Sequence, residues 1–186
     1  MKKEKARMKN ISFIAVVLFV LVSVVYLVNE KYHLFGQHNS DITVLVVSVH
    51  DGDTVSVILN KKQEKVRLTG IDAPEMAQEP WGQEAKKHLE TLLNAANWKV
   101  RLEYDIEKKD RYGRILAYLW TDDRKFINLM MIKSGYAMLY TFPPNVKYVN
   151  ELRAAQEEAR EGKLGIWSEE GLKERPGDYR KEHPRL

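Results

Sequence analysis

The sequence predicts an α+β fold, because two kinds of apolar pattern follow one another along its 186 residues. Runs rich in β-branched residues predict strands, and apolar residues at three- and four-residue spacing predict helices. Five strands are predicted, with one helix between the third and the fourth and two helices after the fifth. This order is typical of a five-stranded Greek-key β-barrel of the OB type with three helices. An uncharged N-terminal segment predicts a transmembrane helix in front of the barrel.

The N-terminal segment 11–28 holds eighteen residues without a charge, about 27 Å as a helix and long enough to cross the hydrocarbon of a membrane. Residues 1–10 carry five basic side chains against Glu4, so we expect this tail to stay in the cytoplasm. The same flank argues against a buried core helix. No small-x-small cleavage motif follows Tyr26. We therefore expect an uncleaved signal anchor, with cleavage and secretion as the alternative.

Charge and cysteine content narrow the function classes. The net charge of +4 equals the charge of residues 1–10 alone, so the rest of the chain is formally neutral. A basic surface that would by itself indicate nucleic-acid binding is therefore not predicted. Cysteine is absent, which excludes disulfides, thiolate metal sites and a cysteine nucleophile.

The strands begin after residues 29–41, which are polar and aperiodic and predict a linker. The first three strands follow one another closely, the third after the turn-like "NKKQE", and predict an antiparallel meander. The last two flank the charged "IEKKDRYG", which we expect at the tip of a long hairpin. The predicted strands cover residues 42–49, 54–59, 65–71, 98–105 and 114–120.

Three segments predict helices. Between residues 81 and 97, apolar or small side chains fall on one helical face. The second helix covers "KFINLMMIKSG", where Gly135 is a natural C-cap, and the third covers residues 148–162. The stretch after Ser168 is charged and contains two prolines, so we expect a flexible tail over residues 169–186. The globular domain is then predicted over residues 42–168.

The stretch "SVHDGDTVSVI" places acidic residues between two predicted strands. Asp-Gly is a strong hairpin signal, because both residues tolerate a positive φ. If the second and third strands pair, Asp53 lies roughly opposite Asp72 at the end of the third strand. Two close carboxylates share a proton or bind a cation, and oxygen ligands select calcium or magnesium. We expect Asp51 to support the site rather than to be a ligand.

Two arginines accompany the carboxylates. Arg67 places a permanent charge inside an apolar strand, where the plain structural explanation is an edge position or an ion pair with Asp72 or Glu75. Arg114 repeats this arrangement at the start of another strand. Two guanidinium groups beside a carboxylate site could clamp a phosphate. Together with a metal and a base, they indicate phosphoryl transfer.

Four segments carry a resemblance to a known family. "DGDTVSV", "VRLTGIDAPE", "DRYGRILAYLW" and "EGKLGIWS" occur in this order within residues 42–168. In order and spacing they resemble the staphylococcal nuclease (thermonuclease) family. The resemblance implies the OB-type barrel and a calcium-dependent phosphodiester hydrolase. It implies Asp53 and Asp72 as calcium ligands, with the backbone carbonyl of Ala73 as a third, at a position where many members have threonine.

The resemblance also implies roles for other side chains. Glu75 matches the residue that orients or deprotonates the attacking water. Arg67 and Arg114 match the two phosphate-binding arginines. Tyr112 and Tyr140 are the candidates for the nucleoside pocket, and packing against the barrel is the competing explanation for both.

The hypothesis is a membrane-tethered, calcium-dependent nuclease that hydrolyses DNA and RNA, mainly single strands, to 3′-phosphate products. We expect a monomer with its catalytic domain on the extracellular side of the cell membrane. The main alternative is a non-catalytic OB-type nucleic-acid-binding module, against which the retained Glu75, Arg67 and Arg114 argue. A third alternative, an anchored domain that binds protein or envelope polymer, leaves these residues unexplained.

Overall fold

The computed structural model describes residues 17–23 and 42–184. The chain divides into two compact units, residues 1–39 and 40–186, of which the second holds the globular domain. Residues 17–23 are helical. No helix in the two described stretches has the length and apolar character needed to cross a membrane. Most of the predicted transmembrane segment 11–28, the tail 1–10 and the linker 29–41 lie outside the described residues, so these assignments stay predictions.

Five strands close into a barrel, as the sequence predicts, and their order is β1-β2-β3-β6-β5. All neighbouring pairs are antiparallel except β3 and β6, which run parallel and complete the closure. This arrangement fits the OB-type barrel. The barrel strands are β1 (Ile42–Val49), β2 (Thr54–Leu59), β3 (Lys62–Leu68), β5 (Lys99–Glu103) and β6 (Ile115–Trp120).

A short ribbon beside the barrel was not predicted. The strand expected over residues 65–71 ends at Leu68, and the chain turns at Gly70, whose φ of +83° suits glycine. It then continues as β4 (Ile71–Asp72), which pairs with β7 (Met138–Leu139). Asp72 therefore lies on this separate ribbon and not at the end of the third barrel strand.

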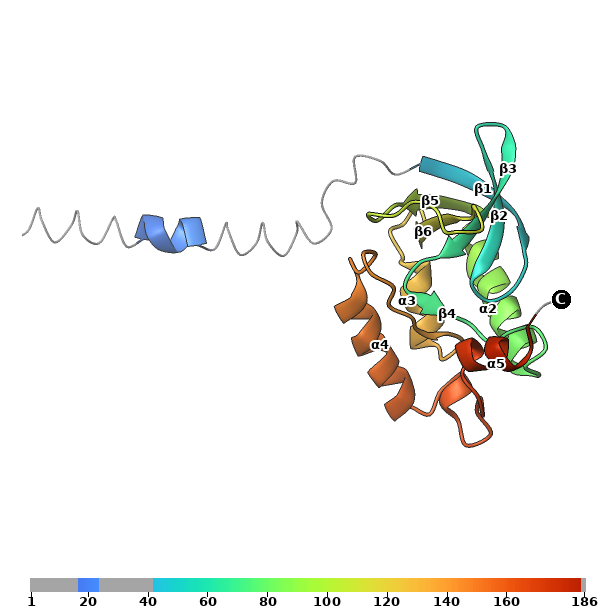
Figure 1. Cartoon of the computed structure of the whole chain (residues 1–186). Helices are drawn as coiled ribbons and strands as arrows, with labels where there is room; N and C mark the ends of the chain where they lie inside the picture. Colours follow the sequence, from blue (N-terminus) through green and yellow to red (C-terminus); the bar gives the residue numbers. More distant parts are fainter. Residues whose placement is uncertain (1–16, 24–41, 185–186) are drawn as a thin grey trace, which may run out of the picture. The chain divides into compact units, whose positions relative to one another are not determined.

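The helices gather on one side of the barrel (Figure 1). In α2 (Trp81–Ala95), Ala85, Leu89 and Leu93 are buried, because residues three or four apart lie on one helical face. The other helices are α3 (Ile127–Lys133), α4 (Val149–Glu161) and α5 (Pro176–Glu182), with a 3₁₀ turn η1 (Gly165–Trp167) between the last two. The three predicted helices are present within residues 42–184. The fourth, α5, lies where we expected a flexible tail.

One hydrophobic core joins the barrel to its helices. Valine side chains of β1, β2 and β3 alternate into the barrel interior, as the period of two in a half-buried strand requires. Ile127, Met131 and Ile132 of α3 and Leu152 of α4 close one end. The core fixes the barrel, and the candidate site lies on β3, on β4 and on the loops around them.

Candidate active site

The loop between β1 and β2 presents Asp53 from a buried position. Its hairpin is confirmed, but the reason for Gly52 differs from the one the sequence suggests. The φ of Gly52 lies outside the left-handed region; a Cβ there would instead meet the Cβ atoms of Ala73 and Ala85 at 2.6 and 2.7 Å. Glycine is thus required by close approach to α2 and to the loop after β4. The Asp51 carboxylate accepts the Asp53 backbone N–H at 3.1 Å and holds the turn.

Arg67 joins the two predicted carboxylates. Its Nη2 lies 3.0 Å from Asp53 Oδ2 and 2.9 Å from Asp72 Oδ1. Both carboxylates are almost fully buried, and burying charge without a partner is costly. The Asp53 carboxylate also accepts the backbone N–H of Ala73 at 2.8 Å and the hydroxyl of Thr54 at 3.0 Å. Hydrogen bonding therefore orients Asp53 and places it near the chain that follows Asp72.

Burial dominates the electrostatics of this pair. It raises the pKa of Asp53 to about 6, although the Arg67 guanidinium acts in the opposite direction. Burial raises the pKa of Asp72 as well, against the hydrogen bonds from Arg180 and the charge of Arg67. Like-charge repulsion also raises both values, from Asp51 for the pKa of Asp53 and from Asp53 for the pKa of Asp72. The pair is therefore most stable with positive charge beside it.

Glu75 lies on the loop after β4, which joins the ribbon to α2. Its backbone N–H donates to the side-chain oxygen of Gln78 at 3.0 Å, and the Gln78 amide donates to the backbone carbonyl of Glu174 at 3.0 Å. The Glu75 carboxylate accepts from Arg180 Nη1 at 2.8 Å. The same guanidinium contacts both oxygens of Asp72. Glu75 and Asp72 thus share one arginine from α5.

Arg114 lies directly before β6, the strand that pairs with β3, which carries Arg67. Arg67 pairs with Leu116 across the parallel β3–β6 contact. Arg114 stands two residues before Leu116, so it comes next to this contact along the chain. Its Nε donates to Asp110 Oδ2 at 2.7 Å. This hydrogen bond lowers the pKa of Asp110, although partial burial acts to raise it.

Tyr112 forms an exposed surface beside the second arginine. The Arg114 guanidinium lies 5.7 Å from the centre of its ring, and Arg111 lies over the ring at 4.8 Å. Tyr112 is 69% exposed, so much of its surface faces solvent although Arg111 lies over the ring. The Asp110 carboxylate accepts the backbone N–H groups of both Tyr112 and Arg114. One aspartate thus shapes the hairpin tip that carries both residues.

Tyr140 follows β7, and its backbone N–H donates to the carbonyl of Gly70 at 3.0 Å. This contact ties Tyr140 to the turn two residues before Asp72. Its side chain is 45% exposed, so the packing explanation does not account for the whole ring.

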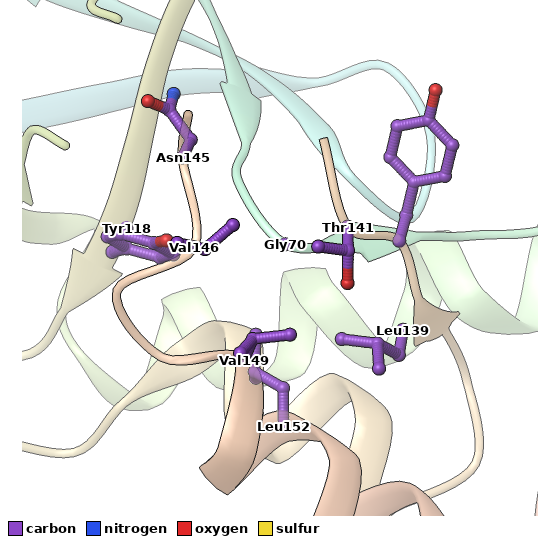
Figure 2. Close-up of a pocket in the computed structure, with 9 residues that line it drawn as sticks. Gly70, Tyr118, Leu139, Thr141, Asn145, Val146, Val149 and Leu152 are labelled. Atoms are coloured by element: carbon purple, nitrogen blue, oxygen red, sulfur yellow. The ribbon is translucent and has the colours of Figure 1, made fainter. Parts of the chain in front are cut away.

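A small hollow beside Tyr140 lies between α4 and the β4–β7 ribbon. Figure 2 shows Leu139, Val149 and Leu152 converging on it. It is too small to hold a water molecule. Its polar Asn145 is already paired with the backbone of Glu107. The hollow therefore reflects packing of α4, and the charged residues of the candidate site lie outside it.

The donors of the site suit a hard cation in type. Within residues 17–23 and 42–184, no three or more His, Cys, Asp and Glu side chains are grouped to hold a metal. Two carboxylates, Asp53 and Asp72, are held together by Arg67. Calcium and magnesium accept backbone and water oxygens for their remaining positions. The oxygen-only, negatively charged pair therefore fits such an ion, provided that the remaining ligands are backbone oxygen and water.

Residues 65–169 match the family model described as staphylococcal nuclease homologue. This match covers more than half of the chain, including Arg67, Asp72, Glu75 and Arg114. The chain belongs to the staphylococcal nuclease family. Asp53 precedes the matched segment of this nuclease homologue, and α5 follows it.

Curated relatives of this nuclease homologue agree with the assignment. A thermonuclease of Staphylococcus intermedius is 38% identical over 166 residues, covering 81% of this chain and 95% of the relative. A thermonuclease of Staphylococcus hyicus is 41% identical over 131 residues, covering 68% and 76%. Endonuclease YncB of Bacillus subtilis is 38% identical over 128 residues, covering 65% and 59%. These relatives support a nuclease function for the chain.

Sequence reasoning missed three polar residues that shape the site of this nuclease homologue. Asp110 holds Arg114, and the four-residue spacing in "DRYGR" could have indicated that pair. Gln78 holds the Glu75 loop, and nothing in its local sequence sets it apart. Arg180 contacts Asp72 from 108 residues away. No periodicity or motif links positions so far apart.

Proposed function

We propose that this nuclease homologue is a calcium-dependent phosphodiesterase that hydrolyses DNA and RNA to 3′-phosphate products. One observation carries the proposal: Arg67 links the buried carboxylates of Asp53 and Asp72. Glu75 lies close to this pair, because Arg180 contacts both Glu75 and Asp72. Phosphoryl transfer needs a cation, a group that handles water and donors for the phosphate oxygens. Carboxylates for a cation, a further acid for water and a guanidinium donor for phosphate are all available around Asp72.

Asp53 and Asp72 would hold calcium through their carboxylates, and Ala73 would contribute its backbone carbonyl. The loss of the threonine found in many relatives leaves a carbonyl ligand intact. Bound calcium supplies positive charge that polarises the scissile phosphate. The family resemblance and the oxygen donors both support calcium, and the buried pair gains a counter-charge from it.

Glu75 would orient and deprotonate the attacking water. Its side chain is 16% exposed against 4% for Asp72, so water reaches it more easily than it reaches the buried aspartates. Arg67 and Arg114 would bind the equatorial phosphate oxygens, because a guanidinium fork matches their geometry. The water oxygen would bond to phosphorus as the bond from phosphorus to the 5′ oxygen breaks. The 5′ oxygen would take a proton from solvent and Glu75 would return its proton to solvent, which leaves the phosphate on the 3′ oxygen.

Tyr112 and Tyr140 would bind bases by stacking. Both rings are substantially exposed, and stacking accepts every base. An unpaired strand offers its base faces, whereas a duplex covers them. We therefore propose that single-stranded nucleic acid is the preferred substrate. We also propose that the protein acts as a monomer.

A Glu75→Gln substitution in the full chain tests the mechanism. We expect cleavage of single-stranded DNA in calcium to fall by about 10²–10⁴-fold, the usual contribution of a general base. EGTA should abolish cleavage by the wild type. Cleavage rates are measured with an end-labelled oligonucleotide.

Glu79→Gln is the matched control, because Glu79 is exposed on the same loop. It should cleave at the wild-type rate. Equal activity of Glu75→Gln and wild type would refute the assigned role. Salt-sensitive binding without any cleavage would favour the alternative of a non-catalytic OB-type binding module.

A further inference from the structure

The helix α5 brings a positive charge onto the carboxylates of the proposed metal site. Arg180 Nη1 lies 3.1 Å from Asp72 Oδ1, and its Nη2 lies 2.9 Å from Asp72 Oδ2. This is a two-point contact between a guanidinium and a carboxylate, the strongest common form of such a pair. Nη1 also lies 2.8 Å from Glu75 Oε1. A single side chain thus contacts the proposed metal ligand and the proposed base.

These contacts leave little of Asp72 for another cation. Oδ1 accepts from both Arg67 and Arg180, while Oδ2 accepts from Arg180. The Asp72 side chain is 4% exposed, so its oxygens can be approached from few directions. A calcium ion must be within about 2.3–2.6 Å of a carboxylate oxygen. Calcium and the Arg180 guanidinium therefore compete for the same oxygen atoms.

Further contacts keep α5 in place. Before the helix, the backbone carbonyl of Glu174 accepts from the Gln78 amide at 3.0 Å, and Pro176 is buried. At Gly177 a Cβ would come within 4.0 Å of Asp72 Oδ2, so the first turn of α5 lies against that carboxylate. Arg180 itself remains 40% exposed. The helix is thus anchored at one end and reaches the site with a side chain that can be released into solvent.

We propose that residues 174–183 form an autoinhibitory strap, in which Arg180 occupies the carboxylate site and must leave before a divalent cation binds. This inference rests on the proposed role of Asp72 as a metal ligand. The strap follows the segment that matches the nuclease family model, residues 65–169. It therefore adds control to a site that the family domain supplies. Calcium binding and docking of Arg180 on Asp72 exclude each other, so each state lowers the population of the other.

Calcium titration of the purified full chain by calorimetry tests the strap. Arg180→Gln removes the competing charge, and we expect it to bind calcium about tenfold more tightly, because the strap no longer has to leave the site before calcium binds. Arg180→Lys keeps the charge but cannot contact both oxygens of Asp72 in a fork. Its affinity should lie between the two. Lys181→Gln is the matched control, since Lys181 pairs with Asp178 inside the same helix, and its affinity should equal that of the wild type.

Hydrogen exchange of the wild type gives a second readout that does not depend on catalysis. Saturating calcium should speed exchange of the backbone amides of residues 178–183, whose hydrogen bonds hold α5. Unchanged exchange would overturn the strap. So would a calcium affinity of Arg180→Gln that is equal to or weaker than that of the wild type, the result expected if Arg180 assists the site. Tighter calcium binding by Arg180→Gln without any nuclease activity would support the strap and refute the proposed reaction.

Discussion

Gly52 shows how the space around one residue positions a carboxylate. The neighbouring Cβ atoms of Ala73 and Ala85 leave no room for a side chain. Ala85 belongs to α2, and the backbone of Ala73 hydrogen-bonds Asp53. One tight contact thus sets the position of the loop against both the helix and the ribbon. The absence of a side chain at Gly52 therefore determines where Asp53 lies.

We expect Gly52→Ala to lower the free energy of unfolding by about 1–3 kcal/mol, the usual cost of overpacking. Because the loop must shift, calcium affinity should fall as well. Urea unfolding and calorimetry measure the two effects.

Gly177→Ala is a suitable control for overpacking, because its Cβ would have no neighbour closer than 3.6 Å. Its midpoint of urea unfolding should be equal to or higher than that of the wild type. Wild-type stability of Gly52→Ala would contradict the close contact.

At the scale of elements, Glu103 ties two barrel strands to the start of α4. It is 1% exposed on β5. Its carboxylate accepts from Trp120 Nε1 of β6 at 2.7 Å and from the Tyr148 hydroxyl at 2.9 Å, and it pairs with Lys147. Burial and this carboxylate raise the pKa of Tyr148, so its hydroxyl keeps its proton. The segment after Tyr140 is thereby fastened to the barrel.

We expect Glu103→Gln to lower the free energy of unfolding by about 1–3 kcal/mol, because buried donors lose their charged acceptor. Glu157→Gln, at an exposed position of α4, should change it by less than about 0.5 kcal/mol. Urea unfolding of both variants provides the measurement. A urea midpoint of Glu103→Gln equal to that of the wild type would show that the network contributes nothing to stability.

For the whole molecule, the N-terminal segment bears on where the domain acts. The chain forms two compact units, and residues 40–186 make up the one with the barrel. We propose that the uncharged residues 11–28, preceded by a basic tail, anchor this domain at the outer face of the cell membrane. Such an anchor would hold the nuclease where extracellular nucleic acid passes.

We expect the full chain to sediment with membranes and to be cut by protease added outside intact cells. Residues 40–186 alone should stay in the soluble fraction and keep their nuclease activity. Immunoblots of fractionated cells measure both. A full-length protein that stays soluble and protected would refute the anchor, and a shortened protein in the medium would favour cleavage and secretion.

Local patterns in the sequence were enough to predict a five-stranded barrel, the helices α2, α3 and α4, and the candidate residues Asp53 and Asp72, although the third strand lies at Lys62–Leu68 and not at 65–71. Strand and helix periodicities are local properties, and the family motifs stand in short segments.

The folded protein was needed to reveal the β4–β7 ribbon, the crowding at Gly52, and the position of α5 over the site. Asp72 pairs with Met138, and Arg180 reaches Asp72 across 108 residues. Contacts at such separations depend on how the barrel closes and on which faces its helices cover, and no local pattern records them.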